Sequence, residues 1–125
     1  MLGERDAVVT IAVKNLDVAR KFYEETLDLT PAETGDPEFI TYRSGNSQVG
    51  VYRSDYAGTN QATTVMWSVG EDLDDIVREL KRKGVTFEHY DLPGMTLDGD
   101  VHVAGELRAA WFKDPDGNIL NLSSM

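Results

Sequence analysis

The stretch Ala109–Leu122, AAWFKDPDGNILNL, runs from one hydrophobic segment through Asp-Pro-Asp-Gly-Asn directly into another. Proline presets a turn, Asp and Asn side chains bond nearby backbone groups, and Gly accepts a positive φ, so this pattern predicts a β-hairpin. The register of a hairpin decides which side chains share a face. We interpret Asp114 and Asp116 as turn-stabilising residues, and we assign them no catalytic role.

Outward from this hairpin, the second half of the chain reads strand, helix, strand and hairpin. The β-branched run Thr63–Glu71 predicts a strand, and Glu71–Gly84 has the apolar spacing of an amphipathic helix that ends at a glycine. Val85–Tyr90 predicts another strand before the final hairpin.

The first half has the same order. Ala7–Asn15 predicts a strand and Asn15–Leu29 an amphipathic helix, and two strand-like runs then flank the turn Ser44–Ser47. Leu16 and Leu73 correspond at an offset of 57 residues, whereas Gly45 and Gly117 are 72 apart.

These offsets predict an internal repeat with an insertion in its second copy. We expect a single α+β domain over residues 1–125, with module one at about 5–55, module two at about 62–125 and an inserted loop at about 91–105, DLPGMTLDGDVHVAG.

Composition restricts the partners. The formal net charge is −10 and there is no cysteine, so disulfides and thiolate metal sites are excluded. The negative field disfavours nucleic acid and anionic lipid and favours neutral or cationic ligands. With no signal-like or membrane-spanning stretch, we expect a cytoplasmic protein that binds a small molecule, and neither nucleic acid nor a membrane.

The segments VKNLDVARKFYEETLDL, LKRKGVTF and WFKDPDGNILNL together resemble the vicinal oxygen chelate superfamily, which includes glyoxalase I, extradiol dioxygenases, fosfomycin-resistance enzymes and bleomycin-binding proteins. The resemblance covers essentially the whole chain. It implies two βαβββ modules that curl into an incomplete barrel around a pocket, usually in a homodimer. A shared fold does not establish a shared function.

In metal-dependent members, His and Glu or Gln side chains hold a divalent cation at the first and last strands of each module. Carried over to this chain, those positions are Val8, Val49, Thr64 and Asn121. Such cations need several anionic or imidazole donors, which these residues do not supply. We therefore expect no metal cofactor at the usual centre. A relocated site formed by His89, His102 and Glu106 is the alternative.

A pocket lined by aromatic side chains and a few polar groups remains. Thr64 and Trp67 should face opposite sides of a regular strand, which makes Trp111 the better pocket tryptophan. We name no catalytic residue, and we predict these ligand-binding residues: Val8, Val49, Tyr52, Thr64, Tyr90, Met95, His102, Arg108, Trp111 and Asn121.

Three function classes remain open. The first is metal-independent binding of a small aromatic or cationic molecule in the cup. The second is a metal-dependent lyase or dioxygenase of the glyoxalase type that uses the relocated site. The third is an accessory domain in which the inserted loop is an interface.

Overall fold

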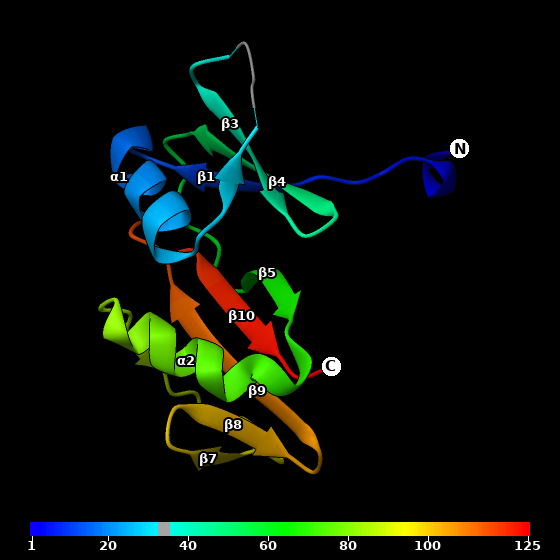
Figure 1. The fold of residues 1–125 in the computed structure, drawn as a ribbon, viewed down its shortest axis with the longest axis vertical. Helices are drawn as coiled ribbons and strands as arrows, with labels where there is room; N and C mark the ends of the chain where they lie inside the picture. The colour runs from blue at the N-terminus through cyan, green and yellow to red at the C-terminus, as the bar shows by residue number, and fades with distance from the viewer. Residues whose placement is uncertain (33–35) are drawn as a thin grey trace. The chain divides into compact units, whose positions relative to one another are not determined.

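The computed structural model describes residues 1–32 and 36–125, which divide into two compact units, Met1–Thr59 and Asn60–Met125. Each unit has a sheet with a helix on one face (Figure 1). In the described residues neither sheet closes into a barrel, and the α+β class is confirmed.

Unit 1 has the predicted order of one strand, a helix and three strands. Its sheet runs β1-β4-β3-β2, with β1 parallel to β4 and antiparallel pairing elsewhere. The segment before β1 runs away from this sheet and carries the short helix η1 (Figure 1). The elements are η1 Leu2–Glu4, β1 Val9–Val13, α1 Leu16–Arg20, η2 Lys21–Thr26, β2 Thr30–Pro31, β3 Phe39–Ser44 and β4 Ser47–Arg53.

The helix of unit 1 begins where the sequence indicates. The side chain of Asn15 caps it by accepting a hydrogen bond from the backbone N–H of Val18 at 3.1 Å. After α1 the chain continues as the π-helical segment η2, which brings Tyr23 against Tyr42 of β3. The buried Tyr42 hydroxyl donates to Glu24 Oε2 at 2.7 Å, and burial together with this carboxylate raises the pKa of Tyr42 far above its ordinary value.

Unit 2 repeats this arrangement and adds to it. Its sheet runs β5-β10-β9-β8-β7, with β6 paired to β9 beyond the end of β8 and with β5 parallel to β10. The elements are β5 Thr63–Ser68, η3 Gly70–Asp72, α2 Leu73–Arg82, β6 Phe87–Glu88, β7 Thr96–Asp98, β8 Val101–Ala104, β9 Leu107–Lys113 and β10 Ile119–Ser123.

The predicted hairpin between β9 and β10 is confirmed. The buried Asp114 carboxylate accepts from the backbone N–H groups of Asp116 and Asn118, both at 2.9 Å, and from the Asn118 amide at 2.8 Å. Gly117 has a φ of +89°, which an L side chain rarely adopts. Asp114 therefore has the turn-stabilising role that the sequence indicates.

The inserted segment differs from the expected loop, because β7 and β8 form a hairpin that widens the sheet. Asp100, at its turn, accepts from Lys81 Nζ at 2.6 Å and lies 2.8 Å from His89 Nε2. These two partners, Lys81 first, hold the pKa of Asp100 below its usual value. The insertion thus extends a sheet that the repeat already supplies.

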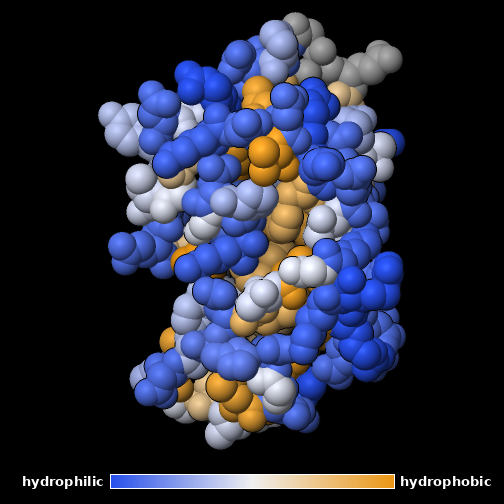
Figure 2. Space-filling view, turned by 90° about the vertical axis from the view of Figure 1, so that its left-hand side faces the viewer, coloured by the Kyte–Doolittle hydropathy of each residue, from blue (hydrophilic) through white to orange (hydrophobic). Residues whose placement is uncertain are grey.

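No helix in residues 1–32 and 36–125 is long and apolar enough to cross a membrane. The surface shown in Figure 2 is hydrophilic over most of its area, with hydrophobic residues visible in patches. This distribution agrees with a charged fraction of 27%.

Candidate functional site

Each sheet has one face under its helix and one face away from it, called the open face here because no helix in the described residues of its own unit covers it (Figure 1). In unit 2, Leu120 and Leu122 of β10 are buried on the helix side, and Asn121 between them belongs to the open face. Strand pairing places Trp111, Met66 and Asn121 side by side, and Trp67 pairs with Leu122 on the other face. The register thus confirms that the two tryptophans lie on opposite faces.

The open face of unit 2 carries an aromatic cluster, defined here as Tyr90, His102 and Trp111. The centroid of Trp111 lies 4.8 Å from that of His102 and 5.7 Å from that of Tyr90, both edge to face. The indole N–H of Trp111 donates to Thr63 Oγ1 at 3.1 Å. The indole edge of Trp111 is therefore held by a hydrogen bond and two rings contact it, while Met66, on the far side of Asn121, is 48% exposed.

Three buried side-chain atoms in the described part of the chain have no hydrogen-bond partner: Thr64 Oγ1, Tyr90 Oη and His102 Nδ1. All three belong to unit 2, and two of them belong to the aromatic cluster. An unsatisfied buried polar group costs about 1–3 kcal/mol of folding free energy. Most buried polar side-chain atoms in folded proteins are hydrogen-bonded, so these three atoms call for an explanation such as a functional role.

The other predicted residues of unit 2 are distributed more widely. Asn121 is buried, and its amide nitrogen donates to the Ala110 carbonyl at 3.1 Å. Arg108 lies on the helix side, where Asp74 of α2 accepts from it at 2.8 Å and raises its pKa. Met95 is half-buried in the turn before β7. Arg108 is thus on the opposite face from Trp111.

In unit 1 the predicted residues also divide between faces. Val8 precedes β1 and is 43% exposed, whereas Val49 is buried and pairs with Tyr42 on the helix side. Tyr52 is on the open face, where its ring stacks on Phe39 with centroids 6.1 Å apart. The structure therefore does not place Val49 on the face of Tyr52.

Strand pairing identifies the unit 1 counterpart of Asn121. Met66 pairs with Asn121, and Thr10, which is 56 residues earlier, pairs with Gly50. Gly50 is covered by the ring of Phe39, because a β-carbon built on it would fall within 2.9 Å of Cε1. The residue at this position thus has no side chain, and alternation along β4 is the sequence signal that could have found it.

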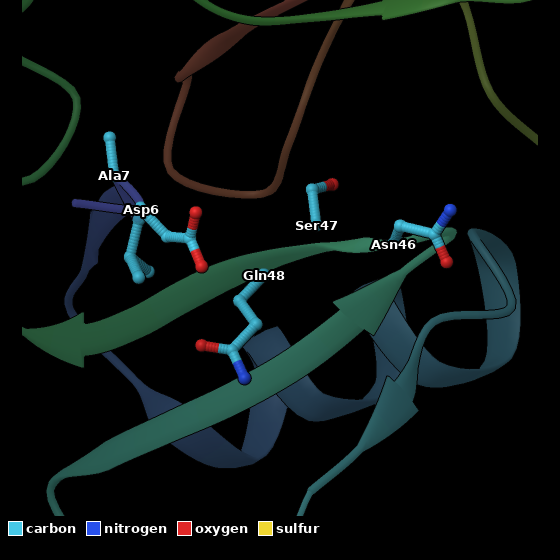
Figure 3. A pocket seen from close by; sticks show the side chains of 6 residues that line it. Asp6, Ala7, Asn46, Ser47 and Gln48 are labelled. Atoms are coloured by element: carbon cyan, nitrogen blue, oxygen red, sulfur yellow. The ribbon is translucent and has the colours of Figure 1, made fainter. Parts of the chain in front are cut away.

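Unit 1 also has a polar cavity of about 360 Å³ beside Val8. Figure 3 shows the Gln48 side chain between Asp6, on the segment before β1, and Asn46, at the β3–β4 turn. Gln48 is not among the ligand-binding residues predicted from the sequence; it adjoins Val49 but belongs to the other face of β4.

The relocated metal site is not assembled. His89 Nε2 is 2.8 Å from Asp100, and His102 Nε2 accepts the backbone N–H of Tyr90 at 2.9 Å. Glu106 is exposed at the turn between β8 and β9. Across the part of the chain that the structure describes, no group of three His, Cys, Asp or Glu residues could hold a metal ion.

Comparison with known families now bears on this arrangement. The model of the Glyoxalase/Bleomycin resistance protein/Dioxygenase superfamily matches residues 7–122. The chain belongs to this superfamily. No curated protein matches the sequence.

Solved structures with the glyoxalase-like fold agree with this assignment. An integron cassette protein from the mobile metagenome of the Halifax Harbour sewage outfall has a TM-score of 0.72 at 18% identity, covering 98% of this chain and 99% of its own. The fosfomycin resistance protein FosX from Mesorhizobium loti has a TM-score of 0.70 at 14% identity, and the match covers 98% of this chain and 92% of FosX. Lactoylglutathione lyase from Agrobacterium tumefaciens has a TM-score of 0.71 at 13% identity, and the match covers 95% of this chain and 92% of the lyase. At these identities the likeness concerns the fold alone.

The metal positions of the superfamily can be tested against the side chains present. Val8 is aliphatic, and Thr64 and Asn121 are neutral. Gly50, which is the counterpart of Asn121 by strand pairing, has no side chain. The Asn121 amide nitrogen is already bonded to backbone. Nickel, zinc, manganese or iron sites require imidazole or carboxylate donors. These residues do not fit a divalent metal.

Proposed function

We propose that this superfamily member binds a small aromatic or cationic molecule without a metal, and that the open face of unit 2 supplies the ring contacts. The aromatic cluster carries the proposal, because Trp111 is flanked by two rings that each have one buried polar atom, His102 Nδ1 and Tyr90 Oη, with no partner among the described residues. Ligand sites typically combine an aromatic lining with a few oriented polar groups.

The donor set supports the metal-independent part of the proposal. A glyoxalase-type lyase or dioxygenase uses its cation to stabilise negative charge or to orient substrate oxygens. The side chains at the superfamily's metal positions include neither a carboxylate nor an imidazole. The net charge of −10 additionally favours positively charged ligands.

Elemental mass spectrometry of the untagged protein, followed by calorimetric titration with Ni²⁺, Zn²⁺, Mn²⁺ and Fe²⁺, tests metal independence. We expect far less than one metal per chain and no saturable heat. One tightly bound metal per chain would overturn the proposal.

Two tryptophans on opposite faces provide a matched pair for the binding test. In a fluorescence screen of aromatic compounds, Trp67→Phe should keep ligand quenching, because Trp111 is then the only tryptophan. Trp111→Phe should lose the quenching, and Trp111→Ala should weaken binding about tenfold or more, as for a residue central to an interface. If Trp111→Ala lowers stability and leaves binding unchanged, Trp111 is a core residue only.

The homodimer implied by the family resemblance remains a prediction. Sedimentation velocity of the untagged chain tests it, with an expected mass of twice 13.9 kDa.

A further inference from the structure

The hydrogen-bonding state of His102 follows from one contact. Its Nε2 accepts the backbone N–H of Tyr90 at 2.9 Å, so the neutral imidazole carries its hydrogen on Nδ1. His102 is only 1% exposed, and its Nδ1 has no partner in the described residues. The cluster thus contains a buried N–H donor whose acceptor is not supplied by the described chain.

Tyr90 presents a second donor in the same cluster. Its hydroxyl is buried and has no partner in the described ranges 1–32 and 36–125, and its ring centroid is 6.0 Å from that of His102. Burial, and then the nearby Glu88, raise the pKa of Tyr90, so the hydroxyl keeps its hydrogen at neutral pH. Both donor-bearing rings contact Trp111.

The charged groups nearby do not favour a cation at this point. Glu88, which pairs with Trp111 across the strands, forms an ion pair with Lys113 Nζ at 3.3 Å. The polar groups beside Trp111 that have no partner among the described residues can both donate: the Nδ1–H of His102 and the O–H of Tyr90. Donors next to an aromatic surface match an acceptor oxygen attached to a ring.

We propose that His102 and Tyr90 donate hydrogen bonds to a carbonyl or carboxylate oxygen of a planar ligand whose ring lies against Trp111. The ligand class is therefore aromatic carbonyl compounds, with ring and acceptor recognised together. This inference rests on the proposed function and narrows it from aromatic or cationic molecules to one chemistry.

A matched series of naphthalene probes tests the inference. The probes are 2-naphthamide, 2-naphthoate, 2-(aminomethyl)naphthalene and 2-methylnaphthalene, which share a ring and differ in one substituent. Dissociation constants are measured by quenching of Trp111 in the Trp67→Phe protein. We expect naphthamide or naphthoate to bind at least tenfold more tightly than methylnaphthalene, a difference of about 1.4 kcal/mol. The comparison of the first two probes distinguishes a neutral from an anionic acceptor.

Two variants assign the effect to the named groups. Tyr90→Phe removes only the hydroxyl and should erase most of the acceptor preference, measured as the ratio of the dissociation constants for naphthamide and methylnaphthalene. Tyr56→Phe is the control, since Tyr56 is 80% exposed and belongs to unit 1. Long-range ¹⁵N–¹H spectra of His102 should show the Nδ1–H tautomer and a shift of its Nδ1 proton on binding of the acceptor probes. This measurement needs no substitution that could impair folding.

The outcomes separate the two proposals. Equal affinities for all four probes would overturn the acceptor role and leave ring binding intact. Tightest binding of the aminomethyl probe would overturn the inference in favour of a cationic ligand. If none of the probes binds, both the proposed function and the inference are wrong for aromatic ligands.

Discussion

Replacing Gly50 with alanine should destabilise unit 1 because of one ring. A β-carbon at Gly50 would fall within 2.9 Å of Phe39 Cε1, which is far inside van der Waals contact, and closer still to Cζ. The ring must move, which disturbs its stacking on Tyr52 at an interplanar angle of 15°. Overpacking of this kind costs about 1–3 kcal/mol.

Replacing glycine with alanine also has a stabilising effect, which offsets part of the cost of the clash. Alanine restricts the unfolded chain more than glycine does, and at a compatible backbone position this stabilises by about 0.4–1 kcal/mol. Gly50 lies in β4 and is not among the positive-φ glycines. The net destabilisation of Gly50→Ala should therefore lie between about 0 and 2.6 kcal/mol in the otherwise unchanged chain.

A double-mutant cycle gives the decisive measurement. In a Phe39→Ala background the clash is gone, so Gly50→Ala should become neutral or stabilising by up to about 1 kcal/mol. Urea unfolding followed by far-ultraviolet circular dichroism gives the four free energies. Gly3→Ala is the control, since nothing lies within 4 Å of a β-carbon there. An equal cost of Gly50→Ala in both backgrounds would refute the role assigned to Phe39.

Two further predictions concern unit 2. Asp114→Ala should lower the free energy of unfolding by about 2–4 kcal/mol, because it removes a buried carboxylate that accepts three hydrogen bonds, and Asp114→Asn should cost less because it keeps one acceptor oxygen. Chemical denaturation measures both, and equal costs would contradict the assigned contacts. The pKa of Asp100 is lowered in the folded state by Lys81 and His89, so its stabilisation should be fully present above its usual value of 3.8 and lost as the pH falls below it. Unfolding free energies of the native chain and Asp100→Asn should therefore differ at pH 7 and converge toward pH 3, and a constant difference would count against this linkage.

Much of the fold was accessible from the sequence because its signals are local. Gly45 and Gly117 mark hairpins at positions where the backbone takes a positive φ, of +57° and +89°. The correspondence of Leu16 and Leu73 also holds, since each begins its α-helix. Periodicity and turn chemistry depend on residues that are close in sequence, so they predict helices and turns without knowledge of tertiary contacts.

The candidate site was less accessible because it depends on strand parity across turns of different length. In unit 1 Ser44 pairs with Ser47 across a two-residue turn, whereas Lys113 and Ile119 enclose a five-residue turn. Counting the same distance from each turn therefore leads to Val49 on the helix side. The counterpart by strand pairing is Gly50, which the parallel pairing of β4 with β1 identifies.

The strand pairing of the inserted segment was also not predictable from the sequence. Gly, Asp and Pro in residues 91–105 indicate an irregular loop, yet β8 pairs with the part of β9 that extends beyond β6, and β7 pairs with β8. This long-range pairing places His102 beside Trp111. A sequence window does not contain that information.

The covering of Gly50 by Phe39 makes the two halves of the internal repeat chemically unequal. A duplicated module begins with two equivalent faces, and a mutation useful to one is carried by only that copy. Here one copy has an aromatic ring over the position, while its counterpart has Asn121 beside Trp111. A substitution at this position therefore has a different effect in each unit, although both units belong to one chain of 125 residues.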